Sequence, residues 1–268
     1  MAQHKIKLSN GLEMSYLDEG SATAEQAPVV LLHGYCGSSA YWEKFIPMIS
    51  EDYRVIAPDL RGHGNSSAPQ GAYSMEIMAE DIRLLLEELE LNKVHLLGHS
   101  LGGYITLAFA ETHSDSLKSF GLIHSTGYPD TPEGKAGRGK AISTIREQGL
   151  EVFMDGLAPK LFAPSHRQSG LDAVDTVKNI GLGTEPHAAA AAAEGMRDRP
   201  DRTAVIADTN LRVLLVAGGE DGVIPPEKTF SSTGNHITQA RLESAGHMSM
   251  LETPRQLAAV VKEFLRTV

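Results

Sequence analysis

Cysteine is almost missing from this chain of 268 residues, since Cys36 is the only one. A single thiol excludes a disulfide within the chain, and it excludes a metal site built from several cysteines. The chain is long enough to bury a substantial core, and its 41% hydrophobic and 22% charged residues are ordinary for a globular protein. One large α/β domain is the expectation for this length.

Positive charge is also scarce, because 24 lysines and arginines stand against 34 aspartates and glutamates, for a formal net charge of −10. That balance argues against nucleic acid and against anionic membrane surfaces as partners. The start of the chain lacks the apolar segment of a signal peptide, and no uninterrupted apolar stretch reaches the length of a membrane span. We therefore expect a cytoplasmic enzyme or binding protein.

What the chain does contain is a regular alternation of strand and helix patterns. Alternating segments around Asn10 and Gly11 predict a hairpin over residues 4–18. Further strands are predicted at residues 28–32, 53–57, 94–97, 119–124, 212–217 and 239–242, and helices at residues 41–49, 75–90, 101–111, 226–233 and 254–265. This alternation is typical of the α/β class, in which helices cover both faces of a mostly parallel sheet.

The alternation stops between residues 125 and 205, where the sequence is helical, irregular and rich in glycine. The alanine run at residues 188–193 predicts a packed helix rather than a disordered linker, because alanine is the best helix former. We therefore expect residues 1–124 and 206–268 to form one core. Residues 125–205 would be a helical insert within that single domain.

One turn motif carries the first chemical signal. Residues 98–103 read Gly-His-Ser-Leu-Gly-Gly between a predicted strand and a predicted helix. A G-x-S-x-G at such a junction makes a sharp turn that presents the serine hydroxyl, and Gly98 and Gly102 let the turn close. In a chain with 26 glycines the pentapeptide alone is a weak signal, so Ser100 needs a base and an acid elsewhere.

His247 and Asp221 are the candidates for those two roles. Both follow predicted strands, at the edge where the sites of open parallel sheets are built. The alternatives are a surface-loop histidine for His247 and an ordinary turn residue for Asp221. The adjacent Glu220 competes with Asp221, but the alternation of side chains would direct it elsewhere. The chain order Ser100, Asp221, His247 is that of one class of serine hydrolases, which favours the catalytic interpretation of all three.

The backbone N–H groups of Leu101 and Tyr35 are the expected donors to the negative oxygen of a tetrahedral intermediate. Leu101 follows the nucleophile at the start of a helix, where the helix dipole adds to the effect. Tyr35 lies in the loop after the strand at 28–32, and Gly34 would let that loop turn its amide inward. An ordinary strand–helix loop with N-capping serines is the simpler interpretation, and both can hold at once.

Together these segments resemble the α/β-hydrolase superfamily. The motifs that carry the resemblance, in the family's order, are His33-Gly34, residues 59–66, residues 98–103, Asp221 and Gly246-His247. The resemblance implies the α/β-hydrolase fold, a structural role for residues 59–66, and a helical lid at residues 125–205. The chain is most similar to the small cap-bearing branch of serine hydrolases with carboxylesterase-like and 3-oxoadipate enol-lactonase-like members.

The residue at the turn also separates this chain from other members of that family. Its haloalkane dehalogenases and epoxide hydrolases carry an aspartate nucleophile, whereas this turn carries Ser100. Some members place the acid after the strand that precedes the lid. Here residues 124–127 read His-Ser-Thr-Gly and the first carboxylate is Asp130, so Asp221 keeps the role of the acid.

Several other residues are weaker candidates for the site. The residues expected to bind substrate are Tyr35, Cys36, His124, Phe153, Phe162, Val223 and Met248. Cys36 lacks an assignable base and is expected to be a small apolar pocket residue rather than a nucleophile. We expect His99 to be structural, and a solvated charged face for Arg138, Lys140 and Arg146, although these three could meet an anionic substrate. No histidine–carboxylate spacing indicates a metal site, so we expect neither a metal nor a cofactor.

These residues predict a hydrolase that cleaves a small carboxylic ester or lactone through an acyl-enzyme on Ser100. Its partners would be a small-molecule substrate and water. The same triad could instead serve perhydrolysis, carbon–carbon bond hydrolysis or hydroxynitrile cleavage, because pocket shape decides between these reactions. Outside enzymes, the alternative is a ligand receptor or signalling protein that retains the triad. The sequence leaves the oligomeric state and the natural substrate open.

Overall fold

The computed structural model describes residues 1–21, 26–169 and 171–268, and its centre is an eight-stranded sheet. The strand order across the sheet is β1-β2-β4-β3-β5-β6-β7-β8. Their bounds are β1 Gln3–Lys7, β2 Glu13–Glu19, β3 Val29–Leu32, β4 Val55–Pro58, β5 Val94–His99, β6 Leu117–Ile123, β7 Arg212–Gly218 and β8 Ile237–Leu242. The predicted α/β class, with a mostly parallel sheet, is confirmed.

One strand, β2, runs against the rest. β1 pairs antiparallel with β2, and β2 pairs antiparallel with β4, whereas every other neighbouring pair is parallel. The predicted hairpin closes at Gly11, whose φ of +88° lies in the left-handed region that glycine tolerates. Because strands β3 to β8 are parallel, their carboxyl ends meet along one edge of the sheet.

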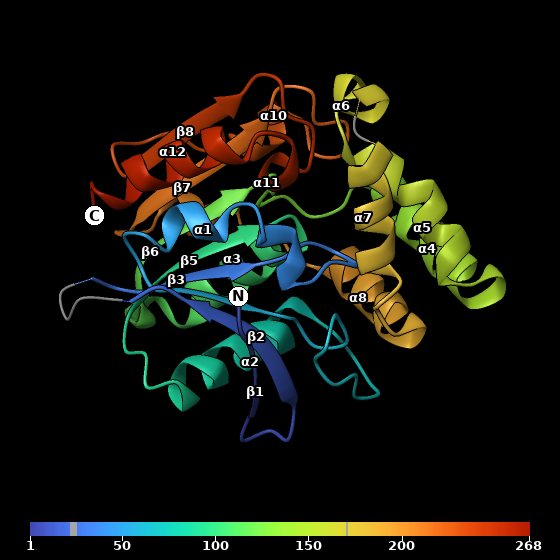
Figure 1. Ribbon diagram of the computed structural model, residues 1–268, viewed down its shortest axis with the longest axis horizontal. Coiled ribbons are helices and arrows are strands. Elements are labelled where there is room, and N and C mark those ends of the chain that lie inside the picture. Colours follow the sequence, from blue (N-terminus) through green and yellow to red (C-terminus); the bar gives the residue numbers. More distant parts are fainter. Residues whose placement is uncertain (22–25, 170) are drawn as a thin grey trace.

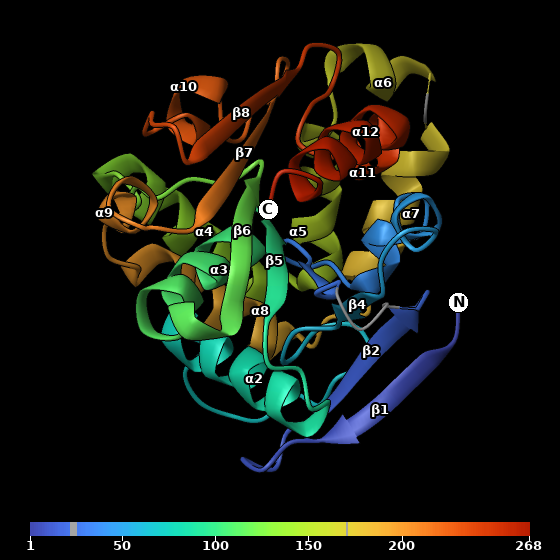
Figure 2. The same ribbon diagram turned by 90° about the vertical axis from the view of Figure 1, so that its left-hand side faces the viewer.

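The parallel strands are apolar throughout because both of their faces are buried. In β7, Val213 and Leu215 point into one hydrophobic cluster, and Leu214 and Val216 point into the other. The helices are α1 Ile46–Ile49, α2 Met75–Glu88, α3 Leu101–Thr112, α10 Pro226–Thr229, α11 Ser249–Glu252 and α12 Pro254–Leu265. Figure 2 shows α2 and α3 on one side of the strands and α12 on the other, where α1 packs against α12. The sheet is therefore the middle layer of three.

The predicted helix at residues 41–49 is interrupted. The structure has a short 3-10 helix, Ser39–Trp42, followed by α1. Pro47 has no backbone N–H and its ring conflicts with the carbonyl four residues earlier, so a continuous helix cannot pass through it. The helix predicted at 226–233 is also shorter and ends at Thr229.

A group of helices lies between β6 and β7 in the chain, as the break in the alternation predicted. These are α4 Pro132–Gln148, α5 Leu150–Leu157, α6 Pro164–Ser169, α7 Leu171–Gly181, α8 Pro186–Asp198 and α9 Thr203–Ala207. Figure 1 shows α4 to α8 gathered at one end of the sheet. The alanine run forms part of α8, which packs on α4, so it is helical as predicted. In the part of the chain that the structure describes, no helix is both long and apolar enough to cross a membrane.

Candidate active site

The nucleophile candidate sits in a strained turn between β5 and α3. Ser100 has φ +50° and ψ −112°, a conformation that L-residues rarely adopt. Its N–H donates to the carbonyl of Ile123 at 3.0 Å. A Cβ on Gly98 would collide with the backbone of Gly102, and a Cβ on Gly102 would collide with the carbonyl oxygen of Leu32. The two glycines are therefore needed for the turn to close, as the motif predicted.

The acid and base candidates are paired at the same edge of the sheet. Asp221 follows β7, His247 follows β8, and His247 Nδ1 lies 2.8 Å from Asp221 Oδ2. The other carboxylate oxygen accepts the backbone N–H groups of Val223 and Ile224, at 2.8 and 2.9 Å. Glu220 is exposed, so the structure pairs the histidine with the residue that the sequence favoured.

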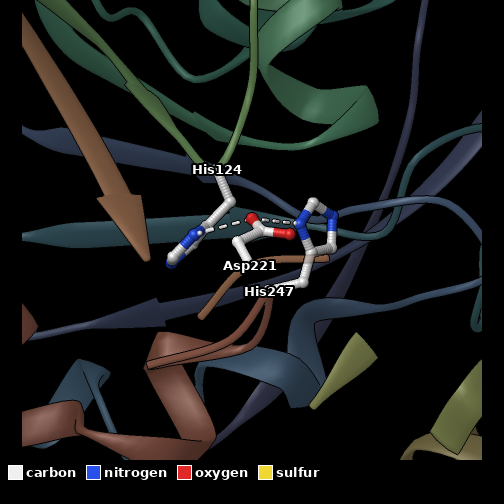
Figure 3. A group of neighbouring side chains, drawn as sticks. All are labelled: His124, Asp221 and His247. Atoms are coloured by element: carbon white, nitrogen blue, oxygen red, sulfur yellow. Dashed lines mark hydrogen bonds and ion pairs between the residues drawn. The ribbon is translucent and has the colours of Figure 1, made fainter. Parts of the chain in front are cut away.

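His124 follows β6 and brings a second imidazole to the same carboxylate. Its Nδ1 lies 3.2 Å from Asp221 Oδ2, outside hydrogen-bond geometry, so this contact is mainly electrostatic. Its Nε2 lies 2.7 Å from the hydroxyl oxygen of Ser249. Figure 3 shows Asp221 between the rings of His124 and His247. The second imidazole was missed as a partner of Asp221, because no sequence spacing links residues 97 positions apart.

The electrostatics of this trio favour an ionised Asp221. Burial disfavours its charge, but His247 and His124 more than offset burial and hold the pKa of the carboxyl well below its usual range. Burial lowers the pKa of His124, although Asp221 acts in the opposite direction. A neutral His124 with its proton on Nδ1 would present the positive end of that N–H dipole to Asp221 while accepting from Ser249 at Nε2.

The trio also contains three groups of the kind that bind metals. One donor atom from each of His124, Asp221 and His247 lies within 4.8 Å of the other two, a proximity that the sequence did not predict. Both Nδ1 atoms, however, approach the same carboxylate oxygen. They are directed at that oxygen rather than at a shared point where an ion would sit, so the arrangement fits hydrogen bonding better than metal ligation.

The loop that carries His247 is held from three sides. His99 Nε2 lies 2.9 Å from the His247 carbonyl oxygen, which gives His99 the structural role expected of it. The His247 N–H donates to the carbonyl of Leu161 in the helical insert, at 2.8 Å. The amides on either side of His247 both donate to Glu252 Oε2, at 2.9 and 3.1 Å. Glu252 was not among the residues singled out from the sequence, because its contacts with Gly246 and Met248 depend on how the loop folds back on α11.

The loop after β3 brings a free backbone amide toward the serine turn. Tyr35 N–H and Leu101 N–H donate to no acceptor within the described part of the chain. A Cβ on Gly34 would lie 2.6 Å from His99 Nδ1, so only glycine fits there. Asp59 accepts the backbone N–H of Ser39 at 2.7 Å, which ties residues 59–66 to this loop. That contact is structural, as the resemblance implied.

A cavity of about 700 Å³ lies between the core and the helical insert. Its wall includes Ser100 and His247 from the core, and Arg138, Phe153 and Met196 from the insert. This volume is in the range of small-molecule sites. The serine and the histidine therefore face the same cavity.

Four of the seven residues predicted to bind substrate line this cavity: Tyr35, Phe153, Val223 and Met248. Three do not. Cys36 and Phe162 are packed into the hydrophobic core, and His124 lies fully buried beside Asp221. Cys36 also has a positive φ of 50°, and burial raises the pKa of its thiol to about 12, so it is not a nucleophile.

Comparisons with known proteins agree with this fold. Residues 27–139 match the family model described as alpha/beta hydrolase fold. A thermophilic esterase from Thermogutta terrifontis, solved with malate bound, is 30% identical, with a TM-score of 0.92 over 100% of this chain and 99% of that one. The enol-lactonase from Burkholderia xenovorans LB400 is 22% identical, with a TM-score of 0.90 over 98% of this chain and 100% of that one, a likeness of fold.

A curated relative is longer than this chain. The dihydrolipoyllysine-residue acetyltransferase component of the acetoin cleaving system of Pseudomonas putida is 29% identical over 89% of this chain, which spans 63% of that relative's length.

The family model, the full-length likeness to a solved esterase and the strand order all agree. The chain belongs to the α/β-hydrolase fold family.

Proposed function

We propose that this protein is a serine hydrolase that cleaves carboxylic esters or lactones through an acyl-enzyme on Ser100. One observation carries the proposal. The imidazole of His247, paired through Nδ1 with Asp221 at 2.8 Å, opens into the same cavity as Ser100. A hydrolytic triad needs a nucleophile and an oriented base that face one substrate.

The hydrogen bond to Asp221 decides which nitrogen of His247 does the chemistry. Nδ1 carries the proton that it donates to the carboxylate, so Nε2 has a free lone pair. In the first step Nε2 takes the proton of Ser100 as Oγ attacks the carbonyl carbon. Asp221 keeps this tautomer and stabilises the imidazolium that forms. Ser100 Oγ makes no hydrogen bond within the described residues. In many hydrolases the hydrogen bond between the nucleophile and its base becomes short only when substrate binds.

The attack places negative charge on the former carbonyl oxygen. The unpaired N–H groups of Tyr35 and Leu101 are available to hold it, and Leu101 is the first residue of α3, where the helix dipole favours an anion. His247 then gives its proton to the departing alcohol. Water attacks the acyl-enzyme by the same route, and the acid is released.

The helical insert at residues 125–205 is proposed to act as a lid. Its support is the cavity itself, one side of which comes from α4, α5 and α8. The carbonyl of Leu161 in the insert also accepts the N–H of His247. A lid in this position would exclude water from the acyl-enzyme and shape the choice of substrate.

The test is Ser100→Ala, with Ser114→Ala as the matched control because Ser114 is exposed and distant from the cavity lining. We expect Ser100→Ala to lower kcat on p-nitrophenyl butyrate by about 10³-fold or more, and the control to match the wild type. A fluorophosphonate probe should add its mass to the peptide that contains Ser100. Retention of hydrolysis in Ser100→Ala, or labelling elsewhere, would contradict the proposal.

A further inference from the structure

Two guanidinium groups share one carboxylate in the wall of the cavity. Asp130 Oδ1 accepts from Arg199 Nη1 at 2.8 Å, and Asp130 Oδ2 accepts from Arg138 Nε at 3.1 Å. All three residues line the cavity. One carboxylate neutralises one guanidinium, so this cluster keeps a net positive charge although the chain as a whole carries −10.

The two arginines differ in how many of their terminal guanidinium nitrogens already donate hydrogen bonds. Arg199 also donates to the carbonyls of Met196 and Tyr128, at 2.7 and 3.0 Å. Its guanidinium lies 3.9 Å above the ring centre of Tyr104 and is almost completely buried. Arg199 therefore holds Asp130 in place, with both of its terminal nitrogens already committed.

Arg138 makes only one hydrogen bond, through Nε. Its two terminal nitrogens have no acceptor in the described part of the chain, and 26% of its side chain remains exposed. Since Arg138 lines the cavity, this free end of the fork is open to a bound molecule. Two parallel N–H donors in a plane match the two oxygens of a carboxylate.

The surroundings connect this arginine with the nucleophile. Ser100 immediately precedes α3, Tyr104 lies in the first turn of that helix, and both line the cavity. Tyr35 and Tyr104 line the same cavity as Arg138. A molecule in the cavity can therefore contact Ser100 at one point and Arg138 at another.

From this geometry we infer that the substrate carries a carboxylate that binds the free nitrogens of Arg138, in addition to the ester or lactone that Ser100 attacks. The inference rests on the proposed function and names its substrate class. A guanidinium with two free nitrogens gives more binding energy to a carboxylate than to a neutral group, because the hydrogen bonds are charge-assisted and can form in a pair. From the sequence, a solvated face was the first expectation for Arg138 and contact with an anionic substrate the alternative; in the structure Arg138 lines the cavity.

The experiment compares an anionic substrate with its neutral match. One pair puts the charge in the acid half: the mono-p-nitrophenyl ester of glutarate and its methyl ester. The other puts it in the alcohol half: 4-carboxyphenyl butyrate and its methyl ester. The ratio of kcat/KM within each pair is measured for wild type, Arg138→Met, Arg138→Lys and Lys140→Met. Lys140 is the control, an exposed cation of the same helix outside the cavity lining.

We expect Arg138→Met to lower the anionic-to-neutral ratio about 10- to 100-fold in at least one pair. Arg138→Lys should recover part of the lost ratio, and Lys140→Met should keep the ratio within about twofold of the wild-type value. Asp130 stays paired with Arg199 in all these variants, so no carboxylate is orphaned. The inference would be overturned if Arg138→Met lowered kcat/KM equally for the anionic and the neutral ester of each pair. It would also be overturned if the wild type did not prefer the anionic ester.

A binding measurement separates this inference from the proposed function. Calorimetry on Ser100→Ala compares monomethyl glutarate with dimethyl glutarate, with and without Arg138→Met. If binding of the monoanion depends on Arg138 but no variant hydrolyses esters, the subsite stands and the proposed reaction is wrong. If hydrolysis depends on Ser100 while neither the ratio nor the binding depends on Arg138, the reaction stands and the subsite is wrong.

Discussion

His124 Nδ1 lies 3.2 Å from Asp221 Oδ2, the oxygen that also accepts the Nδ1–H of His247 at 2.8 Å. Asp221 therefore has imidazoles on two sides and two backbone N–H groups on its other oxygen. His124 does not line the cavity, so in the proposed reaction we expect it to act as a positioning residue, through Asp221. The Ser249 hydroxyl at its far nitrogen fixes the ring.

We predict that His124→Phe lowers kcat by about tenfold while KM changes little. The phenyl ring fills the space but presents no N–H to the carboxylate, so Asp221 is less constrained and its pKa rises. The direction in which the pH profile shifts follows from the lowered pKa of Asp221. Asp221 stays ionised to low pH in wild type, so in the variant the part of the acid-side loss of activity that follows protonation of Asp221 should begin at higher pH. A pH–rate profile of kcat/KM measures this.

Ser249→Ala is the companion variant, since it removes the group that orients His124 and leaves the imidazole in place. A smaller loss with an unshifted profile is expected. Should His124→Phe lower kcat with the same pH profile as wild type, His124 would have a packing role only.

Buried neutral histidines should make this protein sensitive to acid. Burial lowers the pKa of His33 and His95 to about 4, and burial lowers that of His63 to about 3. Their unfolded-state value is about 6.5. Between these values the unfolded chain binds protons that the native protein does not, so the free energy of unfolding falls as pH drops from about 6.5 toward 4. Each histidine contributes on the order of 2 kcal/mol of loss by pH 5.

Urea unfolding at pH 7.5 and pH 5 measures this loss. His95→Gln should flatten the pH dependence because the amide does not titrate and can still pair with the Ser119 hydroxyl, which lies 2.7 Å from His95 Nδ1. His4→Gln is the control, since His4 is exposed. A free energy of unfolding equal at the two pH values would contradict the prediction.

Glu252 is expected to support catalysis without touching substrate. Its Oε2 accepts the amides on both sides of His247, and its Oε1 accepts the N–H of Ala163 in the helical insert at 2.8 Å. Glu252→Gln turns an NH₂ group toward at least one of these donors. We predict a loss of about 1–3 kcal/mol in the free energy of unfolding and a fall in kcat of about tenfold. Denaturant unfolding and steady-state kinetics measure the two effects.

The matched control for that variant is Glu263→Gln, an exposed carboxylate on α12. If Glu252→Gln loses stability while its kcat stays at the wild-type value, Glu252 holds the fold but does not position His247.

The order and placement of Ser100, Asp221 and His247 were readable from the sequence because they depend on local patterns. An apolar run predicts a buried strand, and the residue after it then lies at the carboxyl edge of a parallel sheet. The closing of the serine turn was equally local, since Gly98 and Gly102 face each other four residues apart. Fold class followed from the same periodicity.

Other features depended on contacts between segments far apart in the chain. Asp221 meets His124 across 97 positions, and Arg199 reaches Asp130 across 69. Whether Arg138 faces solvent or a cavity depends on how α4 lies over the core, which its own helical pattern does not encode. Periodicity determines which residues form strands and turns. Long-range side-chain packing decides which charged groups meet. That packing brings His124 to Asp221, and it places Arg138 and Arg199 on Asp130 in the cavity wall.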